Sequence, residues 1–148
     1  MNSNDMKIIK QLMEKGRTTW AELGALLGLS APATAERVRK LEDNGVIKEY
    51  VAVLDPEAAG CSLAAFLLVT LEKTEERGRF LELVKNQAQI QECHHIAGEG
   101  DYLLKVRCGS TKELEKLISE EIKTLPGVKT KTTVVLSTVK ETTKLPLS

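Results

Sequence analysis

The stretch LGLSAP at residues 27–32 decides the fold of the first half of the chain. Gly28 permits the left-handed backbone conformation that follows the end of a helix, and Ser30 is a residue type that begins one. Pro32 fits the first turn of the next helix, where its missing N–H has no partner within the helix. A short turn containing glycine between two amphipathic helices is typical of a helix-turn-helix.

Three helices are expected around this turn. Residues 5–15 carry an apolar stripe that includes Ile8 and Leu12. Thr19 and Glu22 have the spacing of a capping box, so a second helix is expected to begin there and to end near residue 27. The third helix is expected to run from Ser30 to about residue 44, and residues 46–53 to be extended as a small wing or a connecting strand.

The third helix has two predicted faces. The inward face is expected to hold Ala31, Thr34, Val38 and Leu41, and the opposite face Ala33, Glu36, Arg37 and Lys40. In a DNA major groove, Arg37 would donate two hydrogen bonds to guanine, Glu36 would accept from cytosine, and Ala33 would contact a thymine methyl group. Ser30 and the free N–H groups at the start of the helix can bind a phosphate. The alternative is an ordinary solvated helix face, and spacing alone leaves both open.

Charge and composition narrow the choice of protein class. The 148 residues hold 21 Lys and Arg against 21 Asp and Glu, and 42% of them are apolar, which argues against a disordered or a membrane protein. No basic segment leads into an apolar one at the N-terminus, so we expect a cytoplasmic protein. Residues 1–60 hold 8 basic and 9 acidic side chains. A single copy should therefore bind DNA weakly, and useful affinity would require an assembly.

The second half alternates predicted strands and helices. Strands are expected at 61–72, 90–96, 102–108 and 128–139, with helices at 75–86 and from residue 110 or 111 to about 124. The order strand–helix–strand–strand–helix–strand is the ferredoxin-like α+β arrangement, an antiparallel sheet with helices on one face. The other face requires a cover, and a second copy of the chain would supply one. We therefore predict a dimer with buried sheet faces.

The loop GEGD at residues 98–101 is the most distinctive chemical feature of the second half. Its two glycines permit positive φ and let a ligand approach backbone N–H groups. Asp101 can accept a hydrogen bond from an α-amino group. The loop is not a dinucleotide motif, and the alternative is a plain hairpin turn. The sequence shows no recognisable metal, cofactor or catalytic constellation. Adjacent strand residues His94 and His95 point to opposite faces, and three scattered cysteines lack metal spacing.

Several runs of residues resemble the Lrp/AsnC family of feast/famine transcription regulators. In the first half these runs are ELG at 22–24, LS at 29–30, RVRKLEDNGVIKEY at 37–50 and DP at 55–56, followed by Gly60. In the second half, ECH at 92–94 and GEGDYLLKV at 98–106 resemble the family's amino-acid-sensing domain, called RAM. The resemblance covers nearly the whole chain in the right order. Thr34 departs from it, because the family often has an apolar residue there.

The resemblance implies a sequence-specific DNA-binding regulator. It implies homodimers joined through the sensing domains and assembled into tetramers or octamers. It also implies an amino acid or related effector bound between dimers near Gly98, Glu99, Gly100, Asp101 and Tyr102. The expected domains are residues 1–54 for DNA binding, 55–62 as a connecting segment and 63–148 for sensing and oligomerisation. Two alternatives stay open: an architectural DNA-binding protein without an effector, and a ligand-binding regulator of a metabolic enzyme.

Overall fold

The computed structural model describes residues 1–148, which divide into two compact units. The helical unit comprises Met1–Val53 together with Lys140–Ser148, and the sheet unit comprises Leu54–Val139. The last nine residues thus belong with the first unit and not with the second domain, where the sequence predicts them. One contact that holds them there is the ion pair between Lys144 Nζ and Glu14 Oε2, at 2.9 Å.

The helical unit contains the three predicted helices, each begun by a side-chain cap. They are α1 (Ser3–Glu14), α2 (Trp20–Leu27) and α3 (Ala31–Asp43). Thr19 and Glu22 form the predicted capping box of α2, and Ser30 Oγ accepts a hydrogen bond from the backbone N–H of Ala33 at 3.3 Å. Gly28 has φ of 70°, the left-handed conformation that the turn between α2 and α3 requires.

A small aliphatic core holds the three helices together. Its buried members are Ile8, Leu23, Val38 and Leu41. Gly24 lets the α2–α3 turn fold tightly, because a Cβ there would lie 2.6 Å from the backbone oxygen of Leu29. The conformation of the turn between α2 and α3 therefore depends on Gly24, inside α2, as well as on Gly28.

Residues 46–53, expected as a wing or a strand, have no regular secondary structure. Val51 and Val53 are largely exposed there, at 67% and 82%. A strand needs a hydrogen-bonded neighbour, and none of the four strands in the chain pairs with this segment.

The sheet unit has the predicted order of elements. They are β1 (Leu63–Leu71), the 3₁₀ turn η1 (Thr74–Glu76), α4 (Arg77–Asn86), β2 (Ile90–His95), β3 (Tyr102–Cys108), α5 (Thr111–Lys116), η2 (Leu117–Glu121), η3 (Ile122–Thr124) and β4 (Val128–Val134). The strands lie in the order β2-β3-β1-β4, and each neighbouring pair is antiparallel. Together with the helices of the first unit, this confirms the α+β class and the ferredoxin-like topology.

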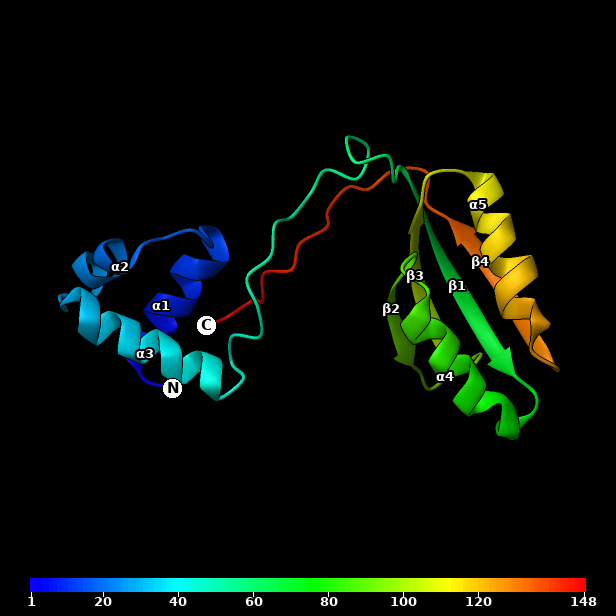
Figure 1. Ribbon diagram of the computed structural model, residues 1–148, viewed down its shortest axis with the longest axis horizontal. Helices are drawn as coiled ribbons and strands as arrows, with labels where there is room; N and C mark the ends of the chain where they lie inside the picture. The colour runs from blue at the N-terminus through cyan, green and yellow to red at the C-terminus, as the bar shows by residue number, and fades with distance from the viewer. The chain divides into compact units, whose positions relative to one another are not determined.

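Both helices of the sheet unit cover one face of the sheet (Figure 1). The strand residues on that face alternate with outward ones, so Leu67, Leu104 and Val106 are fully buried against Phe80 and Leu117. The opposite sheet face carries Phe66, which is 39% exposed, and the half-buried Leu68 and Leu103. An apolar strip thus remains uncovered in the single chain.

Two elements differ from the sequence prediction in form. The helix expected to run to residue 124 is α-helical only to Lys116, then passes through a π-helical stretch and a 3₁₀ turn. The final strand ends at Val134 instead of residue 139, and Leu136 and Val139 are 99% and 100% exposed. Beyond Val134, only Val135 continues the pairing, donating to the backbone oxygen of Ala64.

Candidate DNA interface and effector loop

The outward row of α3 consists of exposed residues three and four positions apart. Ala33, Glu36 and Lys40 are all exposed, on the side away from the buried Thr34, Val38 and Leu41. The row presents a methyl group, an acceptor and a cationic donor in succession, which are the groups that the edges of base pairs recognise.

Arg37 does not point outward with this row, contrary to the sequence prediction. It follows Thr34 by three positions and precedes Leu41 by four, so it lies beside the buried stripe. Its Nη1 donates to Asp5 Oδ1 and to Asn2 Oδ1, both at 3.2 Å, and the Arg37 side chain is only 33% exposed. The guanidinium is therefore directed toward the start of α1.

Arg39 is the outward arginine, although it is absent from the row predicted from the sequence. Its side chain is 65% exposed, and its Nη1 lies 2.7 Å from Glu36 Oε2. The signal was present in the sequence, because Arg39 follows Glu36 by three positions, a spacing that places both on one face of a helix. Exposed pairs of this kind contribute less than about 1 kcal/mol, so Arg39 can exchange Glu36 for another partner at low cost.

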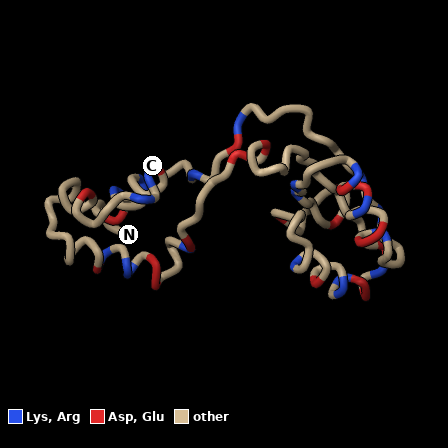
Figure 2. The backbone as a smooth tube through the Cα atoms, turned by 45° about the horizontal axis from the view of Figure 1, so that its top comes forward, with Lys and Arg blue, Asp and Glu red and all other residues tan.

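Ser30 lies at the start of α3, as predicted. Its hydroxyl oxygen accepts from Ala33, which leaves the hydroxyl proton available to a phosphate oxygen. Basic and acidic residues are interspersed along the unit, where blue and red segments alternate along the tube (Figure 2).

The loop between β2 and β3 has the backbone that its glycines predict. Gly98 has φ of 139° and Gly100 φ of 76°. The loop is closed by a hydrogen bond from Ile96 N–H to the backbone oxygen of Asp101, at 3.0 Å, and Asp101 N–H donates to Val69 O at 2.9 Å. The N–H groups of residues 97–100 donate no hydrogen bond within the chain.

Asp101 has a structural role in addition to the predicted role in effector binding. Its Oδ2 accepts a hydrogen bond from the backbone N–H of Leu71 at 2.7 Å. Together with the bond from Asp101 N–H to Val69, this fixes the end of the loop to the end of β1. The other carboxylate oxygen, Oδ1, has no partner in the structure and can still accept a hydrogen bond.

Tyr102 is a core residue at the base of the loop. It is 4% exposed, and the centroid of its ring lies 5.0 Å from that of Phe80 and 4.9 Å from that of His95. Its hydroxyl is buried without a hydrogen-bond partner. Of the predicted effector residues, Gly98 and Glu99 are exposed, Gly100 and Asp101 half-buried and Tyr102 buried.

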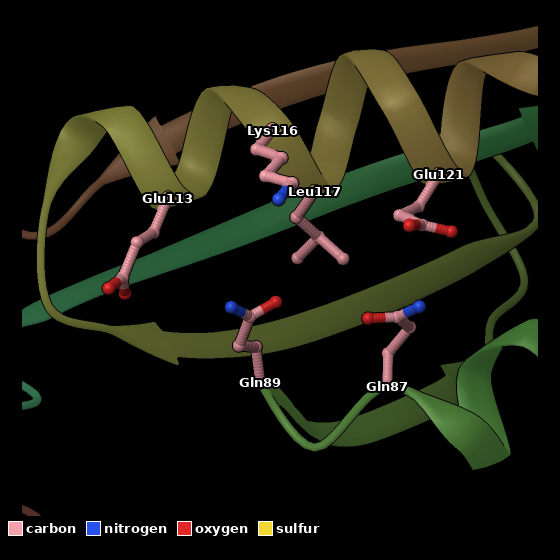
Figure 3. Close-up of a pocket in the computed structure, with 6 residues that line it drawn as sticks. All are labelled: Gln87, Gln89, Glu113, Lys116, Leu117 and Glu121. Carbon is pink, nitrogen blue, oxygen red and sulfur yellow. The ribbon is translucent and has the colours of Figure 1, made fainter.

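A separate polar cleft lies between α5 and the connection from α4 to β2 (Figure 3). Its lining residues come from two segments: Gln87, Gln89, Glu113, Lys116, Leu117 and Glu121. Glu113 is partly committed, since its Oε2 accepts from Gly109 N–H at 2.7 Å. None of these lining residues belongs to the predicted effector set at 98–102, so the cleft is not part of that site.

The two histidines do not form a metal centre. His94 Nε2 lies 2.9 Å from Glu92 Oε1, and Lys105 Nζ lies 3.7 Å from Glu92 Oε2. His94 holds the pKa of Glu92 below its usual range, chiefly through this hydrogen bond, with Lys105 acting in the same direction. No group of three or more His, Cys, Asp or Glu side chains is arranged to hold a metal ion.

The fold and these two sites define a regulator with a DNA-binding and a ligand-binding domain. Residues 1–48 match the family described as winged helix-turn-helix DNA-binding, and residues 64–145 match the Lrp/AsnC ligand binding domain. The chain belongs to the Lrp/AsnC family of transcriptional regulators. None of its helices has the length and apolar character needed to cross a membrane.

Individual relatives align over nearly the whole chain. The HTH-type transcriptional regulator FL11 of Pyrococcus horikoshii is 39% identical, covering 97% of this chain and 94% of its own. The leucine-responsive regulatory protein of Escherichia coli K12 is 38% identical, covering 95% and 88%. Among solved structures, a transcriptional regulator of Neisseria meningitidis in complex with L-Met has a TM-score of 0.92 and 30% identity, covering 99% and 96%.

Proposed function

We propose that α3 reads the major groove of operator DNA through Ala33, Glu36, Arg39 and Lys40, with Ser30 on a phosphate at its start. The exposed row on the face of α3 away from the core is the observation that carries this proposal. Arg39 replaces Arg37 in the predicted contact set, because Arg37 is engaged with α1. The remaining members are those predicted from the sequence.

Salt-dependent DNA binding tests this interface. The probe is a DNA fragment selected by the wild-type protein from a random library, and affinity is measured by fluorescence anisotropy over a range of salt concentrations. Lys40→Met should weaken binding and reduce the slope of log K against log salt by about one, because one cation leaves the interface. Lys10→Met, which removes an exposed cation from α1, is the matched control and should leave the slope unchanged. Equal slopes for wild type and Lys40→Met would contradict the interface.

We further propose that the chain binds a free amino acid at the 98–101 loop, next to Tyr102. Two features of the loop support this: the uncommitted N–H groups of residues 97–100, which suit an α-carboxylate, and the free Oδ1 of Asp101, which suits an α-ammonium group. The L-Met complex of the Neisseria regulator shows that a protein of this fold binds an amino acid. We expect the ligand to lie between dimers and to shift assembly or DNA occupancy.

Thermal-shift screening with the twenty amino acids tests the effector proposal. One or a few should raise the melting temperature of the wild type, and Asp101→Asn should abolish that shift. The asparagine keeps an acceptor for Leu71 N–H but replaces the free carboxylate oxygen with an NH₂ donor, which repels an ammonium group. Glu115→Gln serves as the control, because it removes a negative charge at an exposed position of α5, outside the loop. If no amino acid stabilises the wild type, the effector-independent architectural protein is the better explanation.

The exposed sheet face supports a dimer as the functional unit. Phe66, Leu68 and Leu103 form an apolar strip flanked by Lys105 and Lys131, and a second copy would remove this strip from water. A dimer also supplies two α3 helices, which compensates for a helical unit without excess positive charge. We propose that dimers of this kind assemble further into tetramers or octamers.

A further inference from the structure

We propose that Arg37 is a positioning residue for DNA recognition, which holds α3 in place by binding the N-terminal cap of α1 and does not contact DNA. The inference rests on the proposed DNA interface of α3. An arginine on a recognition helix ordinarily suggests a direct contact with DNA. Arg37 would instead support recognition indirectly, by keeping α3 in the correct orientation.

Arg37 contacts the capping box of α1, which is formed by Asn2 and Asp5. At the start of α1, Asn2 Oδ1 accepts from Asp5 N–H at 2.9 Å, and Asp5 Oδ2 accepts from Asn2 N–H at 3.1 Å. Arg37 Nη1 donates to Asn2 Oδ1 and to Asp5 Oδ1, each at 3.2 Å. One guanidinium therefore bonds to both side chains of the capping box, joining residues more than thirty positions apart in the sequence.

The ion pair between Arg37 and Asp5 is partly buried. The Asp5 side chain is only 19% exposed and the Arg37 side chain 33%, unlike the solvated Glu36–Arg39 pair. Partial burial reduces the screening of the attraction by water and ions. The charge-assisted bonds are also directional, so they fix an orientation as well as a distance.

Apart from the Arg37 contact, α3 is held by apolar packing. Its buried side chains are Thr34, Val38 and Leu41, and the apolar core that they face has only two further buried members, Ile8 and Leu23. Apolar packing is not directional and tolerates small rotations of a helix about its axis. The Arg37 contact lies to one side of this stripe and resists such a rotation. Base recognition needs side chains placed to within about 0.5 Å, so a small rotation would displace the whole outward row.

Affinity and specificity measurements separate this role from a direct DNA contact. Arg37→Met should weaken binding to the selected fragment by about fivefold, with the salt slope unchanged. The ratio of affinities for the selected and a scrambled fragment should fall, because displaced side chains of the outward row can still contact phosphates but no longer align with the base edges. Asp5→Asn, which leaves Arg37 intact but removes its ionic partner, should reproduce both effects. The double variant should be no worse than either single one, as expected for partners in one contact.

The same experiment identifies the opposite result. If Arg37 touches DNA, Arg37→Met lowers the salt slope by about one, while Asp5→Asn leaves affinity unchanged or increases it, and the proposal fails. Arg37→Lys keeps the charge and should recover part of the specificity ratio if position is what matters. Far-UV circular dichroism and Trp20 fluorescence at the assay temperature confirm that each variant is folded. Failure of the interface itself is recognised separately, as an unchanged slope in Lys40→Met.

Discussion

The carboxylate of Asp101 lies 2.7 Å from the backbone nitrogen of Leu71 and accepts its hydrogen bond. The side chain thus accepts the hydrogen bond that a backbone carbonyl would accept in a regular strand pair, at the point where β1 passes the start of β3. A loop whose residues 97–100 make no backbone hydrogen bond within the chain is thereby tied to the sheet at one end. The loop can remain open to a ligand while its base stays fixed.

Asp101→Ala should destabilise the protein by about 1.5–3 kcal/mol, because it leaves a half-buried backbone donor without its charged acceptor. Urea unfolding followed by far-UV circular dichroism measures this change. Hydrogen exchange provides the local readout: the amide of Leu71 should lose protection, whereas amides in the middle of β1 should not. Asp101→Asn, which keeps an acceptor oxygen, should be the milder variant. Equal protection of the Leu71 amide in wild type and Asp101→Ala would contradict the anchoring role.

The two loop glycines should differ in their tolerance of a methyl group. Both have positive φ, so either alanine variant loses about 1 kcal/mol or more to backbone strain. A Cβ on Gly98 meets nothing within 4 Å, but a Cβ on Gly100 would lie 2.6 Å from Leu68 Cδ1. Gly100→Ala should therefore lose about 1–3 kcal/mol more than Gly98→Ala.

A double variant isolates this steric effect. Because Leu68 is the obstacle, adding Leu68→Ala to Gly100→Ala should cost less than Leu68→Ala costs in the wild type. Urea denaturation of the four proteins gives the interaction free energy. A strictly additive pair would show that the strain lies in the backbone alone.

A steric clash is also expected when Gly24, in the helical unit, is replaced by alanine. A Cβ at this position would lie 2.6 Å from a backbone oxygen, that of Leu29, and 3.3 Å from Thr34 Oγ1. The backbone cannot move aside as a flexible side chain can, so Gly24→Ala should unfold at markedly lower urea concentration. The fluorescence of Trp20, at the start of α2, reports this transition. Ala25→Gly, at the next and exposed position of α2, controls for the change of residue type and should lose only about 1 kcal/mol.

Short-range chemistry explains how much of the structure was predictable from the sequence. The caps at Thr19 and Ser30, the turn at Gly28 and the alternation of β3 depend on residues a few positions apart, and their elements were all predicted. The partners of Asp101 and Arg37 come from elements thirty or more positions away. No local pattern reveals such pairings. The outward direction of Arg39 is different, because helical spacing alone would have found it.

Thr34 shows how a departure from a family pattern is accommodated. Its hydroxyl donates to the backbone oxygen of Ser30 at 2.9 Å, so the fully buried polar group is satisfied. The same oxygen also accepts from Thr34 N–H at 3.0 Å. A threonine can therefore replace an apolar residue in this core without leaving an unpaired donor or changing the path of α3.

The pH dependence of Glu92 follows from its contacts with His94 and Lys105. A carboxyl group whose pKa is lowered in the folded state stabilises the protein above its unfolded pKa, and this contribution is lost as the pH falls through the folded pKa. The hydrogen bond and the charge interaction with His94 both favour the ionised form of the Glu92 carboxyl group. His94→Ala should therefore raise the titration midpoint of Glu92, measured by NMR on the side-chain carboxyl carbon. Lys105→Met should raise it less, since the hydrogen bond from His94 is the larger cause.

Phe66 lies on the exposed face of the sheet, where the dimer interface is proposed. If a second copy covers Phe66, then Phe66→Asp places a charge in an apolar interface and should convert the dimer to a monomer, because a buried unpaired carboxylate is costly. Light scattering after size-exclusion chromatography measures the mass. Thr133 pairs directly with Phe66 on β4, and Thr133→Ser is a matched control that keeps the face neutral. The monomer should also bind operator DNA more weakly than the dimer, since it presents only one α3. A Phe66→Asp protein of unchanged mass and affinity would place the dimer interface on a different surface.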